Sequence, residues 1–68
     1  MPTFTVYIET EDERLSASLP DRIIGIAMPA PVSQPQGGVY QFSVGEERVE
    51  KTRTRLRALV GDVRVIES

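Results

Sequence analysis

Cysteine and histidine are both absent from this chain of 68 residues. Without cysteine the chain can form neither a disulfide scaffold nor a thiolate metal site. Without histidine it lacks the commonest general base and the commonest metal ligand. No apolar run approaches the roughly 20 residues that a membrane-spanning helix needs. These absences argue against a disulfide-stabilised, a metal-dependent or a membrane-spanning protein.

What remains is the composition of an ordinary globular domain, with 40% hydrophobic residues, 26% charged residues and a formal net charge of −2. The hydrophobic content is too high, and the net charge too low, for a disordered chain. The length allows one domain, and no repeat or linker divides residues 1–68. Met1-Pro2 is typical of a natural start without a signal peptide, so we expect a cytoplasmic protein that does not enter a membrane.

Alternating apolar residues predict strands in the first half of the chain. Thr3–Glu9 (TFTVYIE) is expected to be a half-buried strand. Leu15–Leu19 (LSASL) is expected to be its hairpin partner across a charged turn at Thr10–Arg14. Arg22–Met28 (RIIGIAM) has apolar residues on both sides, as a central strand does.

The second half begins with Pro29–Gly38 (PAPVSQPQGG), whose three prolines and two glycines predict a long loop ending in a turn. Val39–Val44 (VYQFSV) alternates again, and Asp62–Glu67 (DVRVIE) predicts a closing strand. We expect that closing strand to lie antiparallel beside Thr3–Glu9, because this placement keeps the crossover connection right-handed.

Gly45–Val60 is the one segment that is expected to form a helix. Its apolar side consists of Val49, Thr52, Leu56, Leu59 and Val60. Ser43 and Glu46 have the spacing of a capping box, and Gly61 is a typical stop signal. Lys51–Arg57 also alternates with a period of two, as a strand would, but the cap and the stop favour a helix.

The predicted fold class is therefore α+β, a small antiparallel sheet of about five strands in the order β-β-β-β-α-β with one helix packed on one face. Its predicted core includes Phe4, Val6, Ile8, Leu15, Ala17, Leu19, Ile24, Ile26, Met28, Tyr40, Phe42, Val44, Val49, Leu56, Leu59, Val60, Val63 and Val65. One helix covers only one face, so the other is expected to meet water or a partner. That open face is expected to show Thr3, Thr5, Tyr7, Ser16, Ser18, Ile23, Gln41 and Ser43.

No residue pattern predicts catalysis, a cofactor site or a metal site. Lys51 is the only lysine, and its place on the charged side of the predicted helix does not suit a catalytic serine–lysine pair. The acidic residues Glu9, Glu11, Asp12 and Glu13 lack the spacing of a calcium loop and are expected to form a solvated hairpin tip. Gly37-Gly38 lacks the context of a phosphate-binding motif. We therefore expect a protein that is not an enzyme.

Residues Phe4–Asp21 (FTVYIETEDERLSASLPD) resemble the opening hairpin of HicB-type antitoxins, in which a strand, an acidic turn and a small polar strand precede Pro-Asp. The resemblance covers about a quarter of the chain. The isoleucine-rich segment and the proline loop that follow depart from the family pattern, so no functional residue is assigned from it. The predicted element order also resembles small phage proteins that inhibit host enzymes.

The function that we expect is that of a small intracellular protein-binding regulator or inhibitor, which acts by occupying a surface of another protein. An uncovered sheet face, an open edge strand and a proline-rich loop are all typical of such proteins. The partner-binding candidates are Tyr7, Glu11, Asp12 and Glu13 around the first hairpin, and Val32, Gln34 and Gln36 in the proline loop. A homodimer through an edge strand or the open face is compatible with this function.

The alternative is a nucleic-acid-binding protein that uses the basic helix 45–60. Residues 45–68 hold six basic and five acidic side chains, whereas residues 1–44 hold two basic and five acidic ones. The candidates for contacts with phosphates are Arg48, Lys51, Arg55 and Arg57. These side chains are equally typical of a solvated helix face, with long stems that cover the edge of the core.

Overall fold

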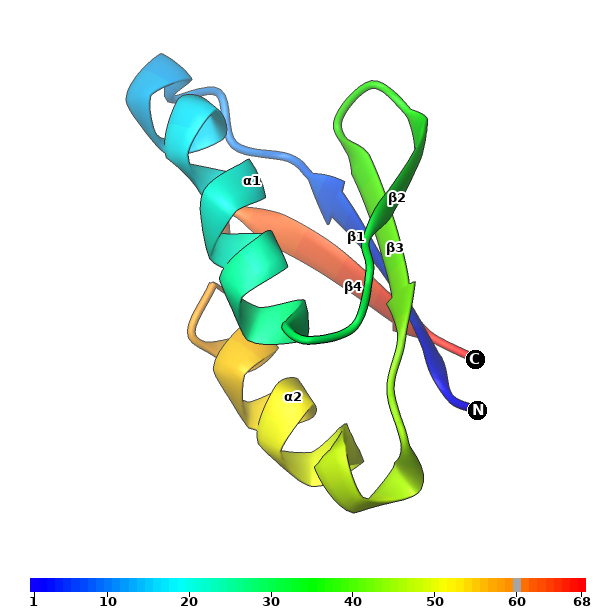
Figure 1. Cartoon of the computed structure of the whole chain (residues 1–68). Helices are drawn as coiled ribbons and strands as arrows, with labels where there is room; N and C mark the ends of the chain where they lie inside the picture. Colours follow the sequence, from blue (N-terminus) through cyan, green and yellow to red (C-terminus); the bar gives the residue numbers. More distant parts are fainter. Residues whose placement is uncertain (60) are drawn as a thin grey trace.

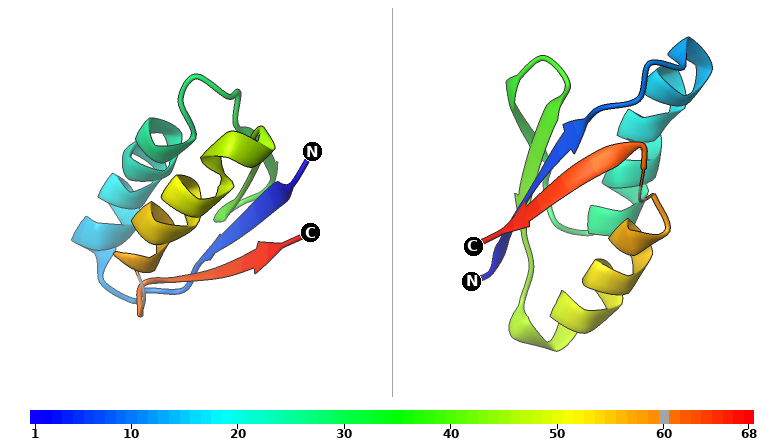
Figure 2. Two further views of the ribbon diagram at one scale, coloured as in Figure 1. Left: turned by 90° about the horizontal axis from the view of Figure 1, so that it is seen from below. Right: turned by 180° about the vertical axis from the view of Figure 1, so that it is seen from behind.

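The computed structural model describes residues 1–59 and 61–68. Its elements are β1 (Thr3–Ile8), α1 (Glu13–Ala27), β2 (Ser33–Gln36), β3 (Val39–Ser43), the 3₁₀ turn η1 (Glu46–Arg48), α2 (Val49–Arg57) and β4 (Val63–Glu67). The fold is α+β, as expected, with a four-stranded antiparallel sheet in the order β2-β3-β1-β4. Both helices lie on the same face of this sheet (Figures 1 and 2). This β-α-β-β-α-β order is the split β-α-β, or ferredoxin-like, topology.

The main correction to the sequence prediction is α1, which replaces two expected strands, Leu15–Leu19 and Arg22–Met28. The described part of the chain therefore has four strands and two helices, instead of about five strands and one helix. The helix begins where the Asp12 carboxylate accepts hydrogen bonds from the backbone N–H groups of Arg14 and Leu15, at 2.9 and 3.3 Å. Such a cap satisfies donors that the first helical turn leaves free. The expected hairpin, and with it the resemblance to HicB-type antitoxins, is thus wrong.

Pro20 lies inside α1 and does not end it. Proline removes one backbone donor from a helix interior and usually kinks or breaks the helix. Here the burial of Leu19, Ile23 and Ala27, each with no exposed area, holds the segment helical. These residues recur every fourth position and so form one stripe along the helix.

The other strands match the expectation more closely. β1, β3 and β4 fall within the alternating segments that predict them. β4 lies antiparallel beside β1, with Val65 opposite Val6, so the expected place of the last strand is confirmed. The expected loop Pro29–Gly38 contains a short strand, β2, before its turn. Gly38, with φ of 75°, completes the tight turn from β2 to β3 in a backbone region that favours glycine.

α2 confirms the expected helix over a shorter range, and Val60 lies outside the described residues. The expected capping box is wrong, because neither η1 nor α2 has a side-chain hydrogen bond at its N-cap. The Ser43 hydroxyl instead lies 2.9 Å from that of Thr3. Gly61, with φ of 94°, turns the chain from α2 toward β4.

The core fills the layer between the sheet and the two helices. It consists of Phe4, Val6, Leu19, Ile23, Ala27, Phe42, Val44, Leu56, Leu59 and Val63. The rings of Phe4 and Phe42 stack with centroids 5.6 Å apart. Ile24 and Met28, which were expected inside, are 44% and 62% exposed, and Ile23, which was expected on the open face, is buried. The helical period accounts for both corrections, because neighbouring side chains on a helix point in different directions.

Candidate binding surface on the open face of the sheet

The face of the sheet that no described helix covers carries three cross-strand rows of side chains. Because Phe4 and Val6 point toward the helices, their neighbours along β1 point to the opposite face. The first row, from β2 to β4, is Gln36, Val39, Tyr7 and Arg64. The second row is Ser33, Gln41, Thr5 and Ile66. The third row pairs Ser43 with Thr3. The right view of Figure 2, turned by 180° from the view of Figure 1, shows this side of the sheet.

Hydrogen bonds between strands fix the polar side chains of the second and third rows. The Gln41 amide nitrogen donates to the Thr5 hydroxyl at 3.1 Å, and the Ser33 hydroxyl donates to the backbone carbonyl of Gln41 at 3.2 Å. The hydroxyls of Thr3 and Ser43 pair at 2.9 Å. A surface whose side chains are already held loses less conformational entropy when it binds a partner.

The first row contains the strongest candidate for a contact residue, the half-buried Tyr7. The guanidinium of Arg64 lies over its ring, 4.4 Å from the centroid, in a cation–π contact. The Arg64 guanidinium is also 3.4 Å from the carboxylate of Glu9. Together these contacts hold an aromatic ring and a cation side by side at one end of the open face.

The structure brings together only some of the residues that the sequence suggests for partner binding. Tyr7 and Gln36 lie in the same row, with Val39 between them. Val32 packs against the core, and Gln34 is exposed in β2. The expected open-face residues Thr3, Thr5, Gln41 and Ser43 are on this face, whereas Ser16, Ser18 and Ile23 belong to α1.

The acidic candidates Glu11, Asp12 and Glu13 lie at the start of α1, not at a hairpin tip. Asp12 is the N-cap of α1, and Glu13 is in its first turn. Negative charges at the N-terminus of a helix interact favourably with the helix dipole, so these residues have a structural role here.

The basic residues of the second half do not form one stripe. The Arg48 guanidinium donates to the backbone carbonyls of Ala27, at 3.4 Å, and Met28, and so ties the end of α1 to the start of α2. Arg55 lies beside Arg22, in the groove between the two helices, and Lys51 is one helical turn before it. Arg57 lies on the other side of α2, against β4.

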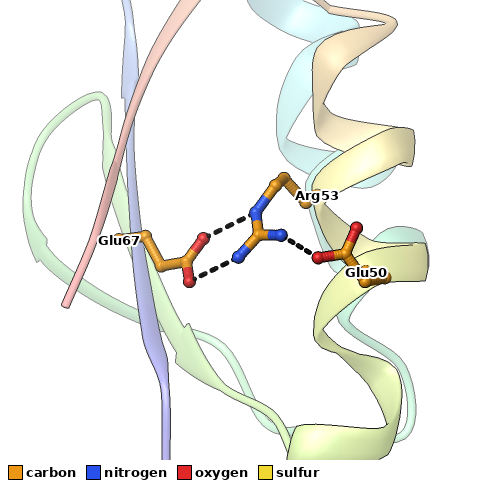
Figure 3. Close-up of polar contacts among 3 residues, drawn as sticks. All are labelled: Glu50, Arg53 and Glu67. Atoms are coloured by element: carbon orange, nitrogen blue, oxygen red, sulfur yellow. Dashed lines mark hydrogen bonds and ion pairs between the residues drawn. The ribbon is translucent and has the colours of Figure 1, made fainter.

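Arg53 on α2 connects the helical layer to the sheet (Figure 3). Its guanidinium donates to the two carboxylate oxygens of Glu67, at 3.0 and 2.9 Å, and also to the Glu50 carboxylate. The hydrogen bonds from Arg53 hold the pKa of Glu67 below its ordinary value, and the same contact raises the pKa of Arg53. Arg53 and Glu67 both line a groove between α2 and β4.

That groove is a largely apolar cavity of about 260 Å³. It is lined by Phe4, Arg53, Leu56, Arg57, Val63, Val65 and Glu67. Val65 is 36% exposed there, and Ile66 on the other face of β4 is 44% exposed. The outer side of β4 thus combines an apolar strand with an apolar groove.

Residues missed from the sequence are Val39, Arg64 and Ile66, all on the open face; the alternation within their strands contained the signal. Within residues 1–59 and 61–68, no helix is long and apolar enough to span a membrane, and no three acidic side chains cluster as a metal site would require. Comparison with known proteins yields no matching family model, no matching curated protein and no matching solved structure.

Proposed function

We propose that this chain is a protein-binding domain that acts as a regulator or inhibitor by covering a partner's surface with the open face of its sheet. The observation that carries the proposal is the ordered set of rows on that face, with Tyr7 and Arg64 in contact at one end. Both helices lie on the opposite side, so the face is free for a flat partner (Figure 2).

The composition of the open face fits a protein partner. Tyrosine and arginine are enriched at protein interfaces, and lysine and glutamate are depleted there. The rows contain Tyr7 and Arg64, but no lysine or carboxylate. The partner that fits has an apolar patch for Tyr7 and Ile66, a carboxylate for Arg64, and polar groups opposite the hydroxyls of the second and third rows.

A nucleic-acid partner has less support. Four-stranded sheets that bind RNA stack bases on exposed aromatic residues. Tyr7 is the only aromatic residue in the rows, and Arg64 already lies over its ring. The basic residues Lys51 and Arg55 lie on one side of α2 and Arg57 on the other, and all three belong to the helical layer.

The test begins with a photo-crosslinking residue placed at Thr5 on the open face, and at exposed Ser18 on α1 as the matched control. We expect the Thr5 probe to form a defined adduct with one protein in extracts of the producing cell, and the Ser18 probe to form none. The affinity of the purified chain for the protein identified in this way is then measured for three forms of the chain: unmodified, Tyr7→Ala and Arg22→Ala. Tyr7→Ala should weaken it about thirtyfold, as expected of an interface hot spot, and Arg22→Ala should leave it unchanged.

Equal adducts from both probes would contradict the proposal, as would an affinity that Tyr7→Ala and Arg64→Ala leave unchanged. An adduct with an oligonucleotide would replace the proposal by the nucleic-acid alternative. The folded state of each variant is checked by circular dichroism, since loss of binding counts only for a folded chain.

A further inference from the structure

We propose that the β4 edge of the sheet pairs with the β4 edge of a second copy of this chain. The two β4 strands would run antiparallel across a two-fold axis. The two four-stranded sheets would then join into one continuous sheet. This goes beyond the proposed function, because it uses the edge of the sheet and not its open face.

The first reason is that the two edges of the sheet differ. The β2 edge has only four residues, contains Pro35, and has a register shift between Ser33 and Gln36. Short strands, proline and bulges are the means by which proteins prevent pairing at an edge. The β4 edge has five residues in regular register with β1 and has none of these features.

The second reason is the direction of the backbone groups in β4. Thr3 and Ser68 exchange two backbone hydrogen bonds, both at 2.8 Å. Because an antiparallel ladder alternates, the N–H and C=O groups of Arg64 and Ile66 also point toward β1. The residues whose groups point to the open edge are Val63, Val65 and Glu67.

The third reason is that the β4 sequence complements itself. A two-fold axis at Val65 places Val65 opposite its own copy and Val63 opposite Glu67, so all the outward backbone groups of β4 find partners. On the open face it places Arg64 opposite Ile66, so no two like charges meet across the two-fold axis there. The added strand also closes the side of the apolar groove beneath Val65.

Charge favours the same arrangement. Arg57 lines the groove near Val63, and it makes no ion pair within residues 1–59 and 61–68. Since Glu67 of the second copy would lie opposite Val63, its carboxylate, which Arg53 of its own chain holds, would face the groove that Arg57 lines. A partner strand with an acidic residue at that place is therefore preferred, and this chain supplies one itself.

The test is sedimentation velocity of the full chain from about 1 to about 500 µM, the range in which a dimer held mainly by one strand pair is expected to dissociate. We expect a reversible dimer. Val65→Pro removes an N–H that the monomer does not use, so it should weaken the dimer at least about tenfold. Arg57→Glu should weaken it as well. Arg55→Glu is the matched control, with the same charge change on the other side of α2, and should have no effect.

Amide hydrogen exchange of the unmodified chain provides a readout that does not depend on how a variant folds. Protection at Val63, Val65 and Glu67 should rise with protein concentration, while that at Ser33 and Gln36 should not. A monomer throughout the concentration range would overturn the inference. So would a dimer that neither Val65→Pro nor Arg57→Glu weakens, or concentration-dependent protection confined to other elements. None of these results bears on binding through Tyr7, so the two proposals fail separately.

Discussion

The chain is built from two β-α-β halves, which differ in both their helices and their edge strands. In the first half, a 15-residue helix with an Asp12 cap leads into β2, a short and irregular edge strand. In the second half, a nine-residue helix without a side-chain cap leads into β4, a regular edge strand. The half with the stronger helix thus has the blocked edge, and the half with the weaker helix has the edge that can still pair.

This difference separates what holds the domain together from what it can contact. α1 contributes three fully buried side chains to the core, whereas α2 contributes Leu56 and the buried Thr52. Nine residues are few for a helix that must hold by itself, so α2 depends on its packing and on its contacts with neighbouring elements. Arg48 donates a hydrogen bond to the end of α1, and Arg53 donates hydrogen bonds to Glu67 of β4. The helix beside the regular β4 edge is thus held by its neighbours, in contrast to α1.

The largest expected effect on stability tests whether residues 22–28 form part of α1 or the strand that the sequence predicts. Ile23→Ala should lower the free energy of unfolding by about 3 kcal/mol, because this side chain is fully buried. Ile24→Ala, on the adjacent and 44% exposed residue, should cost about 1 kcal/mol or less. Urea unfolding measures both. Equal costs, or a larger cost for Ile24, would show that the segment does not form this helix.

The reason that the sequence predicts α1 wrongly lies in how its apolar residues are arranged. Leu15, Leu19, Ile23 and Ala27 recur every fourth residue, which is a helical pattern. Pro20 conceals it by suggesting a break, and the serines make the first part alternate like a strand. Here the burial of that stripe against the sheet outweighs the local strand signal and the proline. β1, β3 and β4 are predicted well because alternation and burial agree there.

The sequence predicts which single residues lie on the open face, but not which of them are neighbours across strands. Alternation in β1 places Thr3, Thr5 and Tyr7 on one face, and this follows from the sequence alone. The neighbours of Tyr7 do not, because Val39 and Arg64 reach it through the registers of two strands that are distant in the chain. The expected hairpin also gave the acidic residues a binding role, whereas Asp12 caps α1.

The second prediction compares the starts of the two helices. Asp12→Ala should destabilise the chain by about 1 kcal/mol, since it leaves the backbone N–H groups of Arg14 and Leu15 without their carboxylate. Glu11→Ala changes a neighbouring exposed acid and should have almost no effect. Ser43→Ala tests the capping box that α2 does not form; it should cost only what the hydroxyl contact with Thr3 contributes. If Ser43→Ala costs more than Asp12→Ala, the helix starts are assigned wrongly. Urea unfolding measures all three variants.

The third prediction concerns the blocked edge. Pro35→Thr restores a backbone donor and a β-favouring side chain in β2, so it should add a second pairing edge. We expect association beyond a dimer in light scattering, with a change in stability within about 0.5 kcal/mol. Gln34→Thr introduces the same residue in the same strand but keeps Pro35, and should leave association unchanged. Identical behaviour of the two variants would show that Pro35 does not protect this edge.

The smallest expected effect is the pH dependence of the bridge between α2 and β4. Because Arg53 lowers the pKa of Glu67 in the folded chain, the bridge stabilises the fold fully above the ordinary glutamate pKa of about 4.5. That contribution is lost as the pH falls through the lowered pKa. Wild type should therefore exceed Glu67→Gln in its urea midpoint at pH 7, and the difference should vanish in acid. Since the side chains of both partners are still about one third exposed, at 33% and 34%, the difference should also shrink in about 1 M NaCl, where the screening length is about 3 Å. A difference that stays constant from pH 7 to acid would mean that the bridge does not contribute through the charge of Glu67, and that β4 is held by its backbone pairing with β1 and the burial of Val63.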